Sequence, residues 1–318
     1  MGIVKVSVWG LGNHSKNRIL PILSKTNGIE LLGVCSRNID SVKEIANHWN
    51  CYGWKNPKEM LNCSELDVVY IATPISTHFA LAKQAIEAGK HVWVEKPLTC
   101  SYADTQALVA LAKKNDKVLT ETFMHLYHPQ FQSVKNFIGS TKVHSIICRF
   151  GIPALDIPGF RNNPDLCGGA FWDVASYTVS TLLSLLPNQQ VEIVFSEILT
   201  KKGLKVDNEG RALLRFSQGV TAYLEWSVGV SYKNEIDLWG VDSSFFTEKI
   251  FSKPKDYQPC YKIRDLYGNE RIEYGIKTEQ FMEMFDNFVE MINDKEKIIK
   301  ERESILQRAK LMHDIVNY

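Results

Sequence analysis

The sequence lacks the features that mark membrane, secreted or nucleic-acid-binding proteins. It contains no run of about 18 apolar residues, so no segment is predicted to span a membrane. Its first residues read directly into a strand pattern, without the regions that make up a secretory signal. The 37 basic and 36 acidic residues give a formal net charge of +1, which provides no electrostatic reason to expect a nucleic acid partner. We therefore expect a cytoplasmic protein that acts on a small molecule.

Paired cysteines are also missing. The seven cysteines are scattered between residues 35 and 260, and none forms a CxxC pair. This distribution argues against a zinc site and against a disulfide framework, and it fits a reducing compartment. His125 and His128 are the nearest approach to a ligand pair, but no third ligand lies at a suitable spacing. We therefore predict that the protein binds no metal.

Strands and helices alternate over the first 122 residues. Short apolar runs rich in β-branched residues are separated by helical patterns, and the first run ends in a glycine turn. This order is typical of βαβ units. We predict an α/β domain over residues 1–122 with a doubly wound parallel sheet, whose strands lie near residues 4–10, 29–36, 67–73, 92–94 and 118–122.

The pattern changes after residue 123, where apolar and polar residues alternate with a period of two. Ala212, Leu214 and Phe216 alternate with Arg211 and Arg215, as expected for half-buried antiparallel strands. Helical patterns near residues 281–292 and 305–316 close the chain. We predict an α+β domain over residues 123–318, built on an open, mostly antiparallel sheet with strands near residues 143–150, 191–200, 211–216, 221–226, 235–238, 245–252 and 261–266.

Two segments of the first domain indicate a bound dinucleotide. Residues 10–15 read Gly-Leu-Gly-Asn-His-Ser, a near-match to the dinucleotide fingerprint with Ser15 in place of its third glycine. The second strand ends in Ser36 and Arg37, with no carboxylate before Asp40. A carboxylate at that point would bind the ribose 2′-hydroxyl of NAD, whereas an arginine suits the 2′-phosphate of NADP. NADP(H) is therefore favoured, and NAD(H) remains the alternative if Arg37 only stacks on adenine.

A lysine stands at the end of the strand formed by residues 92–94. Residues 89–99 read Gly-Lys-His-Val-Trp-Val-Glu-Lys-Pro-Leu-Thr, and Lys96 emerges where doubly wound sheets bind their ligands. Taken alone, such a lysine is usually a solvated charge. Residues 73–78, Thr-Pro-Ile-Ser-Thr-His, follow the preceding strand and suit a loop beside a dinucleotide. For His78, a structural role at the start of a helix is an equal alternative.

The order of these segments resembles the Gfo/Idh/MocA oxidoreductase family. The shared pattern is Gly-x-Gly, then Thr-Pro-x-x-x-His, then Ala-Gly-Lys-His-Val-x-x-Glu-Lys-Pro-Leu. The resemblance implies a Rossmann domain followed by a domain on an open antiparallel sheet, with Lys96 beside the nicotinamide and the substrate. The residues expected to bind the cofactor are Gly10, Gly12, Asn13, His14, Ser15, Ser36, Arg37, Thr73, Pro74, His78, Glu95 and Lys96.

The second domain carries the other chemical motif. Residues 168–177 read Gly-Gly-Ala-Phe-Trp-Asp-Val-Ala-Ser-Tyr, which places Asp173 and Tyr177 on one helix face. Many family members have histidine at the position of Tyr177; tyrosine resembles sugar-nucleotide 3-ketoreductases and the dihydrodiol and glucose–fructose oxidoreductases. A tyrosine is protonated at neutral pH and can donate its proton to a ketone oxygen. The alternative is a buried structural tyrosine.

Other residues are expected to contact the substrate. The segment that opens the second domain resembles the family's substrate-facing segment, which nominates His125 and Tyr127. Arg161 lies in a loop before the double glycine and is a candidate for binding a substrate oxygen or phosphate, with a solvated loop arginine as the alternative. Asp173 is expected either to orient Lys96 or to bind a substrate hydroxyl. The predicted catalytic residues are thus Lys96, Tyr177 and Asp173.

These residues predict an NADP(H)-dependent enzyme that reduces a keto group on a sugar, and the expected substrate is a nucleotide-linked 3-keto-deoxysugar. The first alternative is a dihydrodiol or free-sugar dehydrogenase with the same site, and the second is a catalytically silent dinucleotide-binding regulator. The second domain's sheet also has an outer face that carries Tyr223, Tyr232 and Trp239. We expect this face to be covered by a second copy, in a homodimer or homotetramer.

Overall fold

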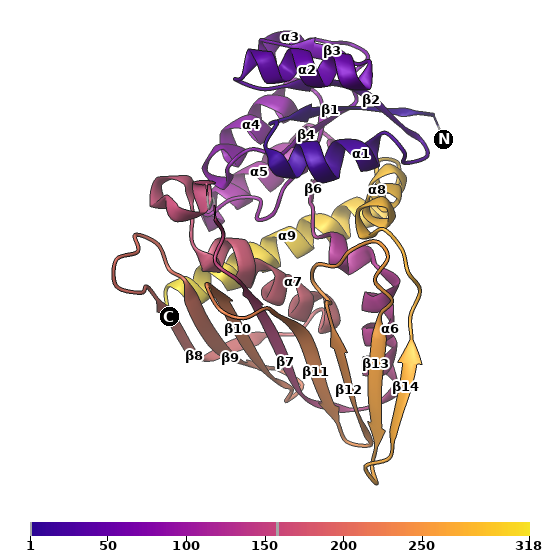
Figure 1. Ribbon diagram of the computed structural model, residues 1–318, viewed down its shortest axis with the longest axis vertical. Coiled ribbons are helices and arrows are strands. Elements are labelled where there is room, and N and C mark those ends of the chain that lie inside the picture. The colour runs from indigo at the N-terminus through magenta and orange to yellow at the C-terminus, as the bar shows by residue number, and fades with distance from the viewer. Residues whose placement is uncertain (1, 157–158) are drawn as a thin grey trace. The chain divides into compact units, whose positions relative to one another are not determined.

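The structure of the chain, a computed structural model, describes residues 2–156 and 159–318 (Figure 1). Its described part divides into two compact units. Unit 1 consists of Met1–Thr122 and Phe281–Leu306, and unit 2 consists of Phe123–Gln280 and Gln307–Tyr318. The division after Thr122 lies where the sequence pattern changes. The C-terminal part differs from the predicted second domain, because residues 281–306 belong to unit 1.

Unit 1 contains a parallel sheet with strand order β3-β2-β1-β4-β5-β6 within the described residues. The chain runs outward from β1 to β3 and then returns to β4 on the other side of β1. This reversal creates a switch point, where ligands bind outside the carboxyl ends of the strands in sheets of this kind. The predicted doubly wound sheet is confirmed. Its strands are β1 (Val4–Trp9), β2 (Ile29–Cys35), β3 (Tyr52–Trp54), β4 (Val68–Ile71), β5 (His91–Val94) and β6 (Leu119–Glu121).

Three helices of unit 1, α2, α3 and α5, begin where a short polar side chain caps them. Asn38, Asn56 and Ser101 each accept a hydrogen bond from a backbone N–H in the first turn of the helix that follows. The apolar residues of these helices pack on the sheet. The helices are η1 (Ser15–Ile19), α1 (Leu20–Leu23), α2 (Ile39–Trp49), α3 (Pro57–Leu61), α4 (Ile75–Glu87), α5 (Tyr102–Lys114), α8 (Gln280–Met291) and the first part of α9 (Lys295–Val316).

Aromatic packing explains why α8 belongs to unit 1. Phe285 and Phe288 are fully buried, and their rings lie 5.8 and 5.4 Å from the ring of Trp93 in β5. The ring of Phe285 also lies 5.8 Å from that of Tyr70 in β4. Burying such rings is worth several kcal/mol each, of the order of 3–5 kcal/mol per truncation to alanine. The sequence showed an apolar face on this helix but did not identify the surface that it covers.

Unit 2 is built on a second sheet, whose order within the described residues is β14-β13-β12-β11-β7-β10-β9-β8. Neighbouring strands are antiparallel except for β7 and β10, which are parallel. The predicted open, mostly antiparallel sheet is confirmed. Its strands are β7 (Val143–Ile152), β8 (Val191–Leu199), β9 (Glu209–Phe216), β10 (Thr221–Val228), β11 (Lys233–Gly240), β12 (Ser243–Glu248), β13 (Cys260–Asp265) and β14 (Glu270–Tyr274).

The sequence missed strand β14. All five of its residues are exposed, since it forms the edge of the sheet and neither of its faces is covered. Its Ile272 and Tyr274 alternate with Arg271 and Glu273, a short period-two pattern that the sequence analysis overlooked. The pairing with β13 identifies this segment as a strand.

The two faces of this sheet differ. Ala212, Leu214, Leu224 and Trp226 are buried on the face that packs against α7 (Ser176–Leu185), which lies along the strands in Figure 1. The other face carries charged residues at the alternate positions. The remaining helices of unit 2 are η2 (Met124–Tyr127), α6 (Pro129–Ser140), η3 (Gly159–Asn162), η4 (Pro164–Leu166), η5 (Phe171–Ala175) and the last part of α9. Among the described residues, no helix is long and apolar enough to cross a membrane.

Candidate active site

The turn after β1 requires glycine at position 10. Gly10 has φ +114°, and a Cβ there would lie 2.6 Å from the carbonyl oxygen of Ala72, just beyond β4. Both the backbone conformation and the close approach exclude a side chain. A Cβ on Gly12, in contrast, would meet nothing within 4 Å, so that side of the turn is open. Open space before the first N–H groups of a helix suits a pyrophosphate.

Ser15 stands where the dinucleotide fingerprint has its third glycine. Its side chain is fully buried, and its hydroxyl has no hydrogen-bond partner in the part of the chain that the structure describes. A buried hydroxyl without a partner costs free energy, which a ligand or a water can relieve. Asn13, at the same turn, is exposed. The orphaned hydroxyl and the open turn fit a bound dinucleotide.

The end of β2 presents a cation and no carboxylate. Arg37 is exposed, and Ser36 accepts a hydrogen bond from the backbone N–H of Asn38. Asp40 lies within the first turn of α2, where its charge favours the helix N-terminus. The composition of this strand end fits the 2′-phosphate of NADP.

His78 joins the two loops that follow β4 and β5. The side chain is buried in α4, with Nε2 2.8 Å from the carbonyl oxygen of Thr73 and Nδ1 3.0 Å from that of Pro97. Burial lowers the pKa of the imidazole, so the ring is neutral and donates to one of these oxygens at a time. Both nitrogens therefore face the chain itself, which favours the structural alternative for His78.

Glu95 is the central acceptor of unit 1. Its carboxylate accepts hydrogen bonds from the Nε2 of His14 at 2.9 Å, the hydroxyl of Tyr70 at 2.5 Å and the hydroxyl of Thr122 at 3.0 Å. Burial alone raises the pKa of this carboxyl, but the charge and hydrogen bond of His14, aided by Tyr70 and Thr122, outweigh burial and lower the pKa to about 2. Glu95 thus holds the glycine-turn helix and the ends of three strands together. The sequence named Glu95 and His14 but contained no signal for Tyr70 or Thr122.

Lys96 lies in a loop that is held at both ends. The hydrogen-bonded carboxylate of Glu95 anchors the residue before it. The backbone N–H of Leu98 donates to the carboxylate of Glu121 at 2.7 Å. The side chain of Lys96 is half-buried at the carboxyl end of β5. The loop therefore has little freedom, which suits a cation that must keep one position.

In unit 2, the rings of four residues enclose Tyr177. The ring centroids of Phe123, His125, Phe150 and Phe251 lie 5.9, 5.3, 5.3 and 6.3 Å from that of Tyr177. The tyrosine hydroxyl lies 3.8 Å from the sulfur of Met124, a weak acceptor. The aromatic surroundings hold the ring while leaving it half-buried. This placement fits a proton donor.

Arg161 and Asp173 form an ion pair beside a cavity of unit 2. The Nε of Arg161 donates to the carboxylate of Asp173 at 2.6 Å, and the arginine side chain remains 38% exposed. A cavity of about 220 Å³ opens next to the pair, and Lys201 and Asp207 also line it. Loop arginines with this exposure can still bind a ligand oxygen. The sequence did not single out Lys201 or Asp207, because they lie far from any motif.

The two other substrate candidates are placed differently. His125 is fully buried, with Nε2 2.9 Å from the hydroxyl of Thr181, so it supports the ring of Tyr177 from inside the unit. Tyr127 is half-exposed at the end of η2.

His128 accepts a hydrogen bond from the backbone N–H of Gln130 and caps α6, and burial lowers the pKa of its imidazole to about 3. No group of acidic, histidine and cysteine residues suited to a metal occurs among the described residues.

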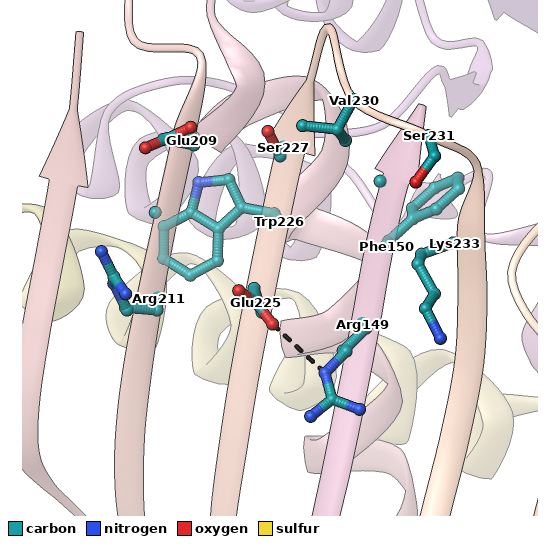
Figure 2. A pocket seen from close by; sticks show the side chains of 12 residues that line it. Arg149, Phe150, Glu209, Arg211, Glu225, Trp226, Ser227, Val230, Ser231 and Lys233 are labelled. Carbon is teal, nitrogen blue, oxygen red and sulfur yellow. Dashed lines mark hydrogen bonds and ion pairs between the residues drawn. The ribbon is translucent and has the colours of Figure 1, made fainter. Parts of the chain in front are cut away.

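A second cavity, of about 370 Å³, lies on the outer face of the sheet (Figure 2). Figure 2 shows Arg149 and Glu225 on this face, joined at 3.2 Å, with the helices of the unit behind the strands. Arg149 also pairs with Glu235 at 3.2 Å. The charge of Arg149 is thus compensated by two glutamates of the same sheet. This cavity carries none of the residues that the motifs nominated.

The switch point with its glycine turn, together with the helix that bears Asp173 and Tyr177, defines the class of protein: a dinucleotide-dependent oxidoreductase. The comparisons with known proteins make the class more specific. Residues 4–123 match the family model of an oxidoreductase family with an NAD-binding Rossmann fold, and residues 136–245 match the GFO/IDH/MocA C-terminal domain. The chain belongs to the Gfo/Idh/MocA family of oxidoreductases, which confirms the family predicted from the motifs.

Several relatives are sugar ketoreductases. A dTDP-3,4-didehydro-2,6-dideoxy-alpha-D-glucose 3-reductase from Actinomadura kijaniata is 28% identical over 263 residues, which are 82% of this chain and 79% of that protein. A solved 3-ketoreductase from the same organism, in complex with NADP and TDP-benzene, has a TM-score of 0.93 at 26% identity and covers 99% of this chain and 97% of its own. A trans-1,2-dihydrobenzene-1,2-diol dehydrogenase from Xenopus tropicalis is 24% identical over 275 residues, or 83% of this chain and 79% of that protein.

The two glycines of the turn should respond differently to the same substitution. We expect Gly10→Ala to lower the free energy of unfolding by at least about 2 kcal/mol, because the new Cβ meets the backbone at Ala72 and φ is positive. Gly12→Ala has room for its Cβ and should stay within about 1 kcal/mol of the wild type. Urea unfolding of both variants measures the difference. Equal stability of the two would contradict the geometry described for the turn.

Proposed function

We propose that this oxidoreductase uses NADPH to reduce the keto group of a sugar, and that the sugar is a 3-keto-deoxysugar linked to a nucleoside diphosphate. The observation that carries the proposal is the pairing of motifs: Glu95-Lys96-Pro97 after β5, and a tyrosine four residues after Asp173. The relatives that act on dTDP-linked keto-sugars support this substrate class. The dihydrodiol dehydrogenase among the relatives supports, as the second candidate, a dihydrodiol or free-sugar dehydrogenase with the same catalytic residues.

The cofactor would be held by the glycine turn, Ser15 and the end of β2. When bound, NADPH supplies the hydride for the carbonyl carbon. The N–H groups at the start of the first helix and the hydroxyl of Ser15 suit the pyrophosphate, and Ser36 and Arg37 suit the 2′-phosphate. Thr73 and Pro74 border the cofactor beyond β4, in a loop that His78 stabilises.

The reduction needs a proton as well as a hydride. Tyr177 donates its phenolic proton to the carbonyl oxygen, which becomes the hydroxyl of the product. The ammonium of Lys96 stabilises the negative charge that develops on this oxygen and eases loss of the phenolic proton. Asp173 keeps the guanidinium of Arg161 in place, so that Arg161 can bind an oxygen of the substrate's diphosphate or sugar. Tyr127 lines the substrate side of unit 2.

Removing either catalytic group should lower turnover. We expect Tyr177→Phe to lower kcat by about 10²- to 10⁴-fold, the usual contribution of a positioned acid. Lys96→Ala should lower it by about 10²- to 10³-fold through lost charge stabilisation. The measurement is steady-state oxidation of NADPH with a dTDP-linked 3-keto-sugar. Tyr267→Phe, which alters a tyrosine that is 86% exposed, is the control and should behave as wild type. Near-normal turnover in both catalytic variants would disprove the mechanism.

The preference for NADPH should depend on Arg37. We expect Arg37→Ala to raise the Kd for NADPH by about 10- to 100-fold, the value of a charge-assisted hydrogen bond to phosphate, and to leave the Kd for NADH nearly unchanged. Fluorescence titration with each nucleotide measures both constants. Lys43→Ala removes another exposed cation, on α2, and should change neither. A wild-type protein that binds NADH more tightly than NADPH would contradict the cofactor assignment.

We also propose that the protein is cytoplasmic and forms a homodimer or homotetramer through the outer face of the unit 2 sheet. Trp239 on this face is 61% exposed and stacks edge-on with His144 at 5.1 Å. Compensated pairs such as Arg149 with Glu225 reduce the cost of covering the charged positions.

The oligomer makes a simple prediction for sedimentation. The wild type should sediment as a dimer or tetramer, and Trp239→Asp should shift it toward the monomer because the new charge would be buried without a partner. Ile3→Asp changes an exposed apolar residue of unit 1 and should leave the mass unchanged. A monomeric wild type at micromolar concentration would contradict this proposal.

A further inference from the structure

Asp207 lies against the start of the helix that carries Asp173 and Tyr177. It belongs to the loop between β8 and β9, and Phe171, at the start of that helix, is 36 positions away along the chain. Its carboxylate accepts the backbone N–H of Phe171 at 2.7 Å, and its backbone carbonyl accepts the N–H of Ala170 at 3.0 Å. The first N–H groups of a helix have no partner within the helix itself. Asp207 therefore supplies two of the acceptors that this helix end requires.

The double glycine before the helix makes room for this contact. Gly169 has φ +116°, and a Cβ there would lie 2.0 Å from the Oδ1 of Asp207. A Cβ on Gly168 would lie 2.4 Å from the carbonyl oxygen of Arg161, which itself accepts the N–H of Gly169 at 2.9 Å. The loop of Arg161 and the loop of Asp207 thus both bind the same helix start. The two glycines are explained by these close approaches.

The geometry leads to one assignment. We propose that Asp207 is a positioning residue, which anchors the first turn of the helix and thereby sets the placement of the Asp173 carboxylate and the Tyr177 hydroxyl. A carboxylate at a helix N-terminus also interacts favourably with the helix dipole. This inference rests on the function proposed above, because Asp207 acts on the reaction only through Asp173 and Tyr177.

The ionisation of Asp207 affects the stability of the fold. Burial raises the pKa of its carboxyl to about 6, against the opposing effect of the backbone hydrogen bonds. The folded chain therefore binds this proton more tightly than the unfolded chain does. The protonated carboxyl stabilises the fold below about pH 4, and this stabilisation is lost as the pH rises through about 6. The charged groups that share its cavity are Arg161, Asp173 and Lys201, and Lys201 also pairs with Glu209 at 3.7 Å. At neutral pH the ionised carboxylate holds the helix at a cost in stability.

Two substitutions test the anchor. Asp207→Ala removes the acceptor for Phe171, so kcat should fall by about 10- to 100-fold, as for an active-site group displaced by about 1 Å. Asp207→Asn keeps an acceptor oxygen but cannot ionise. Like the protonated acid, it can still accept the N–H of Phe171, so it should recover most of the lost kcat and melt no lower than the wild type at pH 7.5. NADPH should bind all of these variants with an unchanged Kd. Asp242→Ala, at an exposed aspartate of unit 2, is the control.

Hydrogen exchange provides a readout that does not depend on the substrate. The peptide spanning residues 168–178 should exchange about tenfold faster in Asp207→Ala, the usual effect of a lost cap, and other peptides should not change. Unchanged exchange, or faster exchange with kcat as in the wild type, would overturn the assignment. If Asp207→Ala does not fold, Asp207→Asn decides: kcat and exchange near those of the wild type are expected, and a loss of kcat without faster exchange at residues 168–178 would overturn the assignment. A wild-type protein that reduces no keto-sugar would contradict the proposed function alone, because the exchange experiment would still decide whether Asp207 anchors the helix.

Discussion

The hydrogen-bonded carboxylate of Glu95 is the interaction on which the ligand side of unit 1 depends. It joins His14 of the first helix, Tyr70 of β4 and Thr122 beyond β6, and it immediately precedes Lys96. Three donors keep the carboxylate ionised despite its burial, with a pKa of about 2. A residue next to this carboxylate has a defined position because the ends of three strands and a helix converge on it.

Unit 2 uses the same principle with backbone groups in place of side-chain donors. Two loops bind the start of the helix that carries Tyr177: one through the carbonyl of Arg161, the other through Asp207. The double glycine lets both approach closely. Lys96 directly follows Glu95, and Tyr177 lies on the helix whose start binds the half-buried Asp207. In each unit a hydrogen-bonded acid thus holds the segment that carries the proposed chemistry.

Much of the fold could be predicted because its signals are local. The βαβ alternation of unit 1 and the period-two alternation of unit 2 follow from which residues face the core, and both were confirmed. The sequence analysis missed the short strands β3 and β14, which have too few residues for a clear pattern. Helix α8 shows in sequence only that it has an apolar side, not that the rings of Trp93 and Tyr70 cover it. For His78, the structural alternative is favoured because both of its ring nitrogens face backbone carbonyls.

The sequence by itself determined the family and the glycine turn, and it nominated Lys96 and Tyr177, because each of these features belongs to a short motif with a characteristic spacing. The tertiary structure alone decided which groups hold them: the donors to Glu95 come from residues 14, 70 and 122, and the anchor of the Tyr177 helix comes from a loop 36 residues further along the chain. A hydrogen bond between distant segments depends on how the chain folds back on itself, and the spacing of residues in the sequence does not predict it.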